Sequence, residues 1–241
     1  PQSIKTTVAD WLDSSQRLRK SMETLLCALE DSTTSEDKNN HTSKINTFRP
    51  AFRRAVLAAE VTARLYSEPT FGSVKSEKIV YLCEKLLGIE EALNHHHLRQ
   101  AAGPYDPSAR RITESIFLSN KWFSVRKDQH RVFYEPGENF GEHKKYYMAY
   151  FSDGQEIIDY VTSTMRFWKT ENCEIVATLY SAWNDLLNAE KNPDDEKIIH
   201  EVMYNWHESK QRIPKERWNS ALGWMRDHHF TPMDARARIV E

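Results

Sequence analysis

The stretch Leu98–Glu138, LRQAAGPYDPSARRITESIFLSNKWFSVRKDQHRVFYEPGE, decides how this chain is expected to fold. Asp106 and Pro107 supply an N-cap and a proline at the first helical position, so a helix should begin near Pro107. Apolar side chains then recur at the helical period, at Ile112, Ile116 and Phe117. The pattern predicts an amphipathic helix that ends near Ser119.

Two aromatic and β-branched runs follow this helix, on either side of a polar turn. The runs 122–125 and 132–134 predict an antiparallel hairpin. Its tip should carry the basic side chains Arg126, Lys127, His130 and Arg131. A helix followed at once by a basic hairpin is typical of the wing half of a winged-helix module, which indicates binding rather than catalysis.

The rest of the chain predicts a mainly α fold, with helical modules, small β-hairpin wings and a long N-terminal helix. Apolar residues form a heptad seam at Ile4, Val8, Trp11, Leu18, Met22, Leu25 and Leu29, and Ser15 is its one polar break. This helix either packs on its own domain or forms a coiled-coil arm that self-associates through Ile4–Leu29. We expect a helix over 1–31, a flexible linker over 32–46, a helical module with a hairpin over 47–170, and a winged-helix-like module over 171–241.

Helical periodicity and breakers place the further helices. They are expected over 52–66, 73–87, 157–168, 175–187, 198–206 and 214–225. Gly88 is a natural C-cap for the second of these. The aromatic run 146–151 fits either a strand or a short buried helix, and residues 236–240 could form a closing strand.

Composition limits the function. Charged residues make up 28% of the 241-residue chain and the formal net charge is −2, so any contact with nucleic acid must be local. Cys27, Cys83 and Cys173 are far apart and look like reduced core thiols of a cytoplasmic protein. No run is long and apolar enough to span a membrane, and the chain begins at Pro1 without a signal-peptide pattern, as expected for part of a longer polypeptide.

No catalytic, metal or cofactor site is predicted. The adjacent histidines 95–97 lack the i, i+4 spacing that brings two ligands to one ion. The acidic cluster of Asp194, Asp195, Glu196 and Glu201 stands at the start of a helix, where helix capping explains it better than a divalent cation does. Helical spacing indicates that most of the C-terminal tryptophans are core residues, namely Trp183, Trp206, Trp218 and Trp224.

Basic side chains are the remaining candidates, because phosphates are contacted by lysine and arginine. The candidate DNA-binding residues are Arg110, Arg111, Lys121, Arg126, Lys127, Arg131, Lys144, Lys145, Lys210, Arg212, Lys215 and Arg217. Acidic residues interrupt the first group, at Asp128, Glu135, Glu138 and Glu142. An ordinary solvated surface is therefore the alternative to a DNA surface.

Three runs carry a family resemblance. They are FGSVKSEKIVYLCEKLLGIEEALNHHHLRQAAGPYD from Phe71 to Asp106, CEIVATLYSAWNDLL from Cys173, and NWHESKQRIPKERWNSALGWM ending at Met225. Together they resemble a domain at the C-terminal end of type I restriction-modification subunits, especially the DNA-specificity subunit. The first run is also similar, more remotely, to a helical antitoxin domain of phage and toxin-antitoxin loci.

The resemblance implies a noncatalytic accessory domain of a bacterial phage-defence protein, which contacts DNA, a partner subunit of the restriction-modification complex, or both. It brings no catalytic residues, and base reading or catalysis would lie elsewhere in the parent complex. The alternative is an antitoxin-like or regulatory domain that binds protein through residues 71–106. A metal-dependent nuclease using Asp194 and Glu196 is the third possibility.

Overall fold

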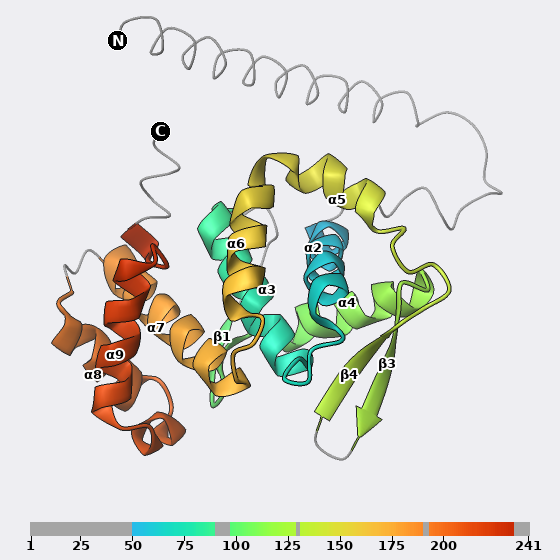
Figure 1. The fold of residues 1–241 in the computed structure, drawn as a ribbon. Helices are drawn as coiled ribbons and strands as arrows, with labels where there is room; N and C mark the ends of the chain where they lie inside the picture. The colour runs from blue at the N-terminus through green and yellow to red at the C-terminus, as the bar shows by residue number, and fades with distance from the viewer. Residues whose placement is uncertain (1–49, 90–96, 129–130, 190–192, 234–241) are drawn as a thin grey trace, which may run out of the picture. The chain divides into compact units, whose positions relative to one another are not determined.

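The computed structural model describes residues 50–89, 97–128, 131–189 and 193–233. This part of the chain is mainly helical, with two small antiparallel strand pairs (Figure 1). The α-helices are α2 (Pro50–Leu65), α3 (Ser73–Leu87), α4 (Pro107–Ser119), α5 (Lys144–Phe151), α6 (Gln155–Met165), α7 (Thr170–Asn188), α8 (Asp195–Asn205) and α9 (Lys215–Asp227). The strands are β1 (Leu98–Gln100), β2 (Gly103–Tyr105), β3 (Phe123–Asp128) and β4 (Arg131–Pro136), and short 3-10 turns cover Ser152–Gly154 and Glu208–Arg212.

Local signals set the ends of the two helices that matter most here. Asp106 caps α4 as predicted, because its Oδ1 accepts from the backbone N–H groups of Ser108 at 3.0 Å and Ala109 at 2.9 Å. Gly88 ends α3 in the left-handed conformation with φ 65°, which glycine adopts without steric cost. Both predicted helices are therefore confirmed at the predicted positions.

One core runs through the described residues. Helix α2 packs against α3, α4, α5 and α6, and its segment 55–59 is almost wholly buried. Helix α7 packs on α3 and β2, while α8 and α9 cover its other side (Figure 1). All of the described residues fall within one compact unit. The free thiols of Cys83 and Cys173 are both buried in it, as predicted.

The β3–β4 hairpin has one face toward the core and one toward solvent. Val125 pairs with Tyr134 in the register, and Tyr134 is buried against Phe71 and Phe117. Arg126 pairs with Phe133 on the opposite face, because successive side chains of a strand alternate. The predicted hairpin is thus confirmed in the ranges that the structure describes.

The structure also settles one element that local patterns left open and adds a hairpin that they did not predict. Residues 146–151 belong to helix α5, not to a strand. The β1–β2 hairpin, which no pattern in the sequence predicts, pairs Leu98 with Tyr105. Its strands are too short to show a period, and packing on α3 and α7 holds β2 in place.

The tryptophan interpretation is confirmed for Trp183, Trp206 and Trp218, which are buried. Trp224 is partly buried and packs on Trp168, with ring centroids 4.7 Å apart. No helix within the described ranges is long and apolar enough to cross a membrane. The heptad seam, the 32–46 linker, Cys27, His95, His96 and the expected strand 236–240 lie outside the described residues.

Candidate functional site

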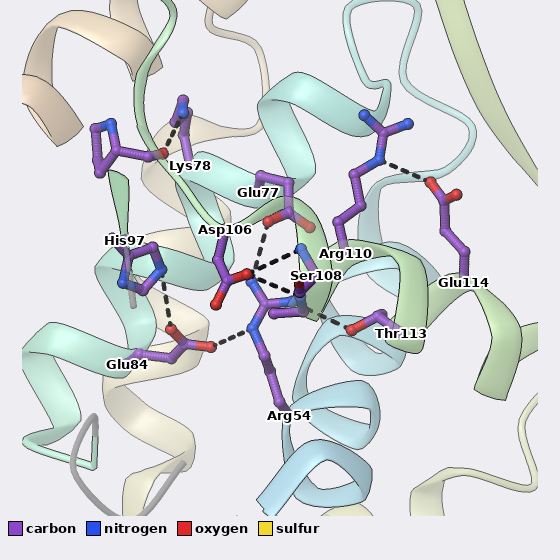
Figure 2. A network of polar contacts seen from close by, with 12 residues as sticks. Arg54, Glu77, Lys78, Glu84, His97, Asp106, Ser108, Arg110, Thr113 and Glu114 are labelled. Atoms are coloured by element: carbon purple, nitrogen blue, oxygen red, sulfur yellow. Dashed lines mark hydrogen bonds and ion pairs between the residues drawn. The ribbon is translucent and has the colours of Figure 1, made fainter. Parts of the chain in front are cut away.

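A buried arginine joins three helices next to the GPYD run. Arg54 on α2 is 1% exposed. Its guanidinium donates to Glu77 Oε2 at 3.0 Å, to Glu84 Oε1 at 3.0 Å and to Thr113 Oγ1 at 3.1 Å. Figure 2 shows the guanidinium beneath Asp106, with Glu84 on one side and Thr113 on the other. The network ties α3 and α4 to α2.

The carboxylates of this network keep the buried Arg54 guanidinium charged. Burial works against the charge of Arg54, but the nearby carboxylates of Glu77, Glu84 and Asp106 raise its pKa above the ordinary value. Glu84 also lies 3.9 Å from Nε2 of His97 (Figure 2). The guanidinium therefore stays protonated, and its bonds with Glu77 and Glu84 are charge-assisted, which makes them stronger than neutral hydrogen bonds.

The GPYD run, residues 103–106, meets this network and the first half of α7. Nζ of Lys78 donates to the carbonyl oxygen of Pro104. Gly103 has φ 92°, and a Cβ there would lie 2.7 Å from Oγ1 of Thr178 on α7. Gly103 therefore allows a close approach, Pro104 accepts the buried lysine, and Asp106 caps α4. These residues form the framework that fixes α4.

Two lysines of α3 are buried as well. Burial lowers the pKa of Lys78 to about 8, against the opposing effect of Glu77 and Glu174. Lys75 donates to the carbonyl oxygens of Arg166 at 2.7 Å and Trp168 at 2.8 Å, where α6 ends. Both ammonium groups thus bind backbone carbonyl oxygens of neighbouring segments.

The outer face of α4 is the part of the candidate region that remains open. Its exposed residues are Ser108, Arg111, Ile112, Ser115, Leu118 and Ser119, and none is acidic. Ile112 is 46% exposed and Leu118 is 54% exposed. The acid of this helix, Glu114, lies to one side and accepts from Arg110 at 2.9 Å and from the Tyr134 hydroxyl at 3.2 Å. A phosphate near the outer face would thus meet Arg111 without a neighbouring exposed carboxylate on α4.

The hairpin carries less free positive charge than its sequence indicates. Arg126 pairs with Glu135 at 2.9 Å, and Arg131 donates to the Pro69 carbonyl at 2.8 Å. Both guanidiniums lie over the Phe133 ring, at 5.2 Å and 4.8 Å from its centroid. Lys127 is exposed, and no carboxylate among the described residues pairs with it.

Several other candidates form ion pairs at the surface. Lys121 pairs with Glu138 at 2.6 Å and Lys145 with Glu142 at 3.5 Å. In the C-terminal part, Lys215 pairs with Glu196 at 2.6 Å and Arg217 with Glu171 at 2.6 Å. Arg111, Lys144 and Arg212 join Lys127 as basic side chains without a carboxylate partner in the described part of the chain.

Lys210 must be removed from the candidates for DNA contact. Its side chain is 1% exposed and its Nζ lies 2.6 Å from Oε1 of Glu174. Burial lowers its pKa, and the bond with Glu174 works in the opposite direction. A basic residue just before a helix is expected at the surface, but the 3-10 turn Glu208–Arg212 directs Lys210 inward, where it contacts Glu174 of α7.

The acidic side chains at the start of α8 cap the helix or form ion pairs within the fold. Asp194 caps the helix, with Oδ1 accepting from the backbone N–H of Lys197 at 2.9 Å, so the capping interpretation is confirmed. Asp195 pairs with Arg226 on α9, and Glu196 with Lys215. Among the described residues, no group of three histidine, cysteine or acidic side chains is placed to hold a metal ion.

A second buried polar cluster was not predicted. His143, which precedes α5, is wholly buried, and its Nε2 lies 3.1 Å from Oε2 of Glu60 on α2. Burial alone would raise the pKa of Glu60, but hydrogen bonds with His143 and Arg64 lower it. The one available signal was Glu60 itself, a charged residue inside an apolar stretch of α2.

Comparisons of the chain with protein-family models, with curated proteins and with solved structures gave no match.

Proposed function

We propose that α2, α3, α4 and the β3–β4 hairpin form a winged-helix-like module, and that the chain is a noncatalytic accessory domain of a bacterial restriction-modification protein that contacts duplex DNA. The observation that carries this proposal is the acid-free outer face of α4 within a locally basic segment. Residues 107–136 hold six lysines and arginines against three acidic residues, in a chain of net charge −2. Local positive charge is what contact with phosphates requires.

The helix and hairpin order supports the proposal. Helices α2 and α3 pack together, α2 packs on α4, and β3 packs on α4. The hairpin follows α4 directly, as a wing follows the third helix of such a module. Its position against the α2–α3 turn, fixed by Arg131 on the Pro69 carbonyl, gives it a defined place beside the helices.

The three runs that carry the resemblance to restriction-modification subunits contact one another in the fold. Lys78 from the first run holds Pro104 near the end of the same run. Gly103 lies against Thr178 of the second run, and Lys210 of the third pairs with Glu174 of the second.

Binding of a fluorescent duplex at low salt, followed by titration with salt, tests the proposal. We expect the affinity to fall linearly with salt concentration on logarithmic axes, because bound phosphates release counterions. Lys127→Glu should weaken binding, whereas Lys169→Glu, an equal charge change at an exposed lysine before α7 that is not a candidate for DNA contact, should leave it near the wild-type value. Absence of binding by the wild-type chain at low salt overturns the proposal, and so does equal weakening by both variants.

A protein-binding role, with a partner subunit or a toxin as ligand, is the competing function. Ile112 and Leu118 on α4 and Leu98 on β1 are exposed apolar side chains that favour it. Most of α3, however, is buried, so the described part of 71–106 offers little continuous surface. Co-purification with a restriction subunit, or rescue of growth from a neighbouring toxin, would support that role in place of DNA binding.

A further inference from the structure

We propose that the protein forms a symmetric dimer through an aromatic face where α6, α7 and α9 meet, with a second copy of this chain as the partner. The aromatic face consists of Tyr160, Phe167, Trp168, Trp224 and His228. None of these residues is a candidate for DNA contact, so the dimer goes beyond the proposed function. The exposure, the fixed position and the charge pattern of the face favour a second copy.

Phe167 is the most prominent side chain of the aromatic face. It is 77% exposed, more than any other large apolar residue in the described ranges. Trp168 and Trp224 are partly buried, with ring centroids 4.7 Å apart, and His228 stacks on the Trp224 ring at 4.4 Å. Aromatic rings that gather at one place on the surface are typical of the centre of a protein interface.

The face is continuous from α6 to α9. Tyr160 is exposed on α6, and its hydroxyl donates to the carbonyl oxygen of His228 at 2.8 Å. Its ring lies 5.3 Å from that of the buried Phe230, which in turn lies 5.1 Å from the Trp224 ring. The aromatic side chains therefore belong to one surface, although they come from separate segments of the chain.

Phe167 is held in place from behind. Lys75 is buried, and its Nζ donates to the carbonyl oxygens of Arg166 at 2.7 Å and Trp168 at 2.8 Å, the residues on either side of Phe167. Nε of Arg166 also donates to Oε1 of Glu68 at 2.6 Å. The turn between α6 and α7 is thus fixed in the free protein. A preorganised aromatic side chain loses little conformational entropy on binding, which suits an anchor residue of an interface.

The charges beside the aromatic face make it complementary to itself. Lys169 follows Trp168, and Asp227 precedes His228 on the far side of Trp224. Both charged residues are exposed, and neither pairs with an opposite charge in the described part of the chain. A two-fold axis through the face would place Lys169 of each copy against the partner's Asp227, which forms two equivalent ion pairs. A second copy therefore fits this face better than a partner that carries charge of one sign.

Reversal of the two charges tests the symmetric arrangement, by sedimentation velocity of the 241-residue chain at micromolar concentration and low salt. The wild type should be a dimer. Lys169→Asp and Asp227→Lys should each be mainly monomeric, because their own dimers would hold two pairs of like charge. An equimolar mixture of the two variants should dimerise again, because every pair between the two different copies then has opposite charge.

Phe167→Ala tests the aromatic centre. It should raise the dissociation constant of the dimer by about 100-fold or more, because each interface loses two anchor residues. Tyr204→Ala is the matched control, since Tyr204 is 62% exposed but lies on α8, outside the aromatic face. It should leave the dissociation constant unchanged, and circular dichroism should show that each variant is folded.

A monomeric wild type at these concentrations overturns the inference and leaves the aromatic face to a different partner. Single charge variants that stay dimeric also overturn it, because self-association would then use another region such as Ile4–Leu29. A mixture that fails to dimerise rules out the two-fold arrangement. None of these results affects the proposed function, which is tested on a duplex with room for one copy, so that Lys169→Glu remains a valid control there.

Discussion

Nη1 of Arg54 on α2 donates to Oγ1 of Thr113 on α4 at 3.1 Å, although the two residues are 59 positions apart in the chain. The same guanidinium holds Glu77 and Glu84 on α3. A single side chain therefore fixes α4 relative to the two helices that carry it. The orientation of the proposed DNA-binding face depends on this buried charge.

Arg54→Met should destabilise the fold by about 3–5 kcal/mol, because it leaves the buried carboxylates of Glu77 and Glu84 without their counter-charge. Urea unfolding followed by circular dichroism measures the loss. Thr113→Val removes only one hydrogen bond of the same guanidinium and should cost about 1–2 kcal/mol. Equal losses in the two variants would show that the ion pairs do not carry the stability assigned to them.

Gly103→Ala should destabilise the fold more than Gly141→Ala. Both glycines have nearly the same backbone conformation, with φ 92° and 93°, so both variants pay for a left-handed alanine. A Cβ at Gly103 would also lie 2.7 Å from Thr178 Oγ1, whereas one at Gly141 would meet nothing within 4 Å. We expect an additional cost of about 1–3 kcal/mol at Gly103, as for other overpacked sites.

Urea unfolding of both glycine variants gives this difference directly. Gly103→Ala combined with Thr178→Ala should recover part of the additional cost, because the second change removes the oxygen that the new Cβ would meet. Equal destabilisation by the two glycine variants would mean that β2 moves away from α7 without cost.

Lys78 should make the free energy of unfolding depend on pH in the alkaline range. Its pKa is about 8 in the fold and 10.5 in the unfolded chain, so between these values the unfolded state binds more protons. The contribution of Lys78 to the free energy of unfolding therefore rises with pH, by at most about 1.4 kcal/mol per pH unit. Below pH 8 both states hold the proton, and the contribution is constant.

The comparison with Lys78→Met isolates this effect. Cys173 has its pKa raised by burial to about 12, so its ionisation above pH 9 favours the unfolded state and works in the opposite direction. Both proteins share that thiol, and it cancels in the difference. Urea unfolding at intervals from pH 7 to 10 should show that, above pH 8, the free energy of unfolding of the wild type rises relative to that of Lys78→Met. A difference between the two proteins that stays constant with pH would contradict the lowered pKa of Lys78.

Much of the local structure could be predicted, and the reason is that its signals are short in range. The cap at Asp106, the glycine after α3 and the alternation in the hairpin each involve neighbours in sequence. Their physical cause is backbone hydrogen bonding within a turn or a strand pair. Helix α4 and the hairpin follow from residues 106–136 alone.

The candidate site was less predictable, because its contacts join distant segments. Nothing near Arg54 indicates that Glu77 and Glu84 will lie beside it, and nothing near Lys78 indicates the Pro104 carbonyl. Arg126 and Arg131 look free in sequence until the register brings Glu135 opposite Ser124 and the fold brings Pro69 close. Positive charge alone therefore did not distinguish a side chain bound inside the fold, such as Lys210, from one exposed at the surface, such as Lys127.

Lys210 and Lys127 give the clearest test of this distinction, because sequence placed both in the same candidate set. Lys210→Met should destabilise the fold by about 1–3 kcal/mol, since it leaves Glu174 partly buried without its partner at 2.6 Å. It should leave the affinity for duplex DNA unchanged, because its side chain does not reach the surface. Lys127→Met should do the reverse, weakening DNA binding with little change in stability. Urea unfolding and duplex titration on both variants check the pair, and loss of DNA affinity in folded Lys210→Met would show that the buried lysine belongs to the interface after all.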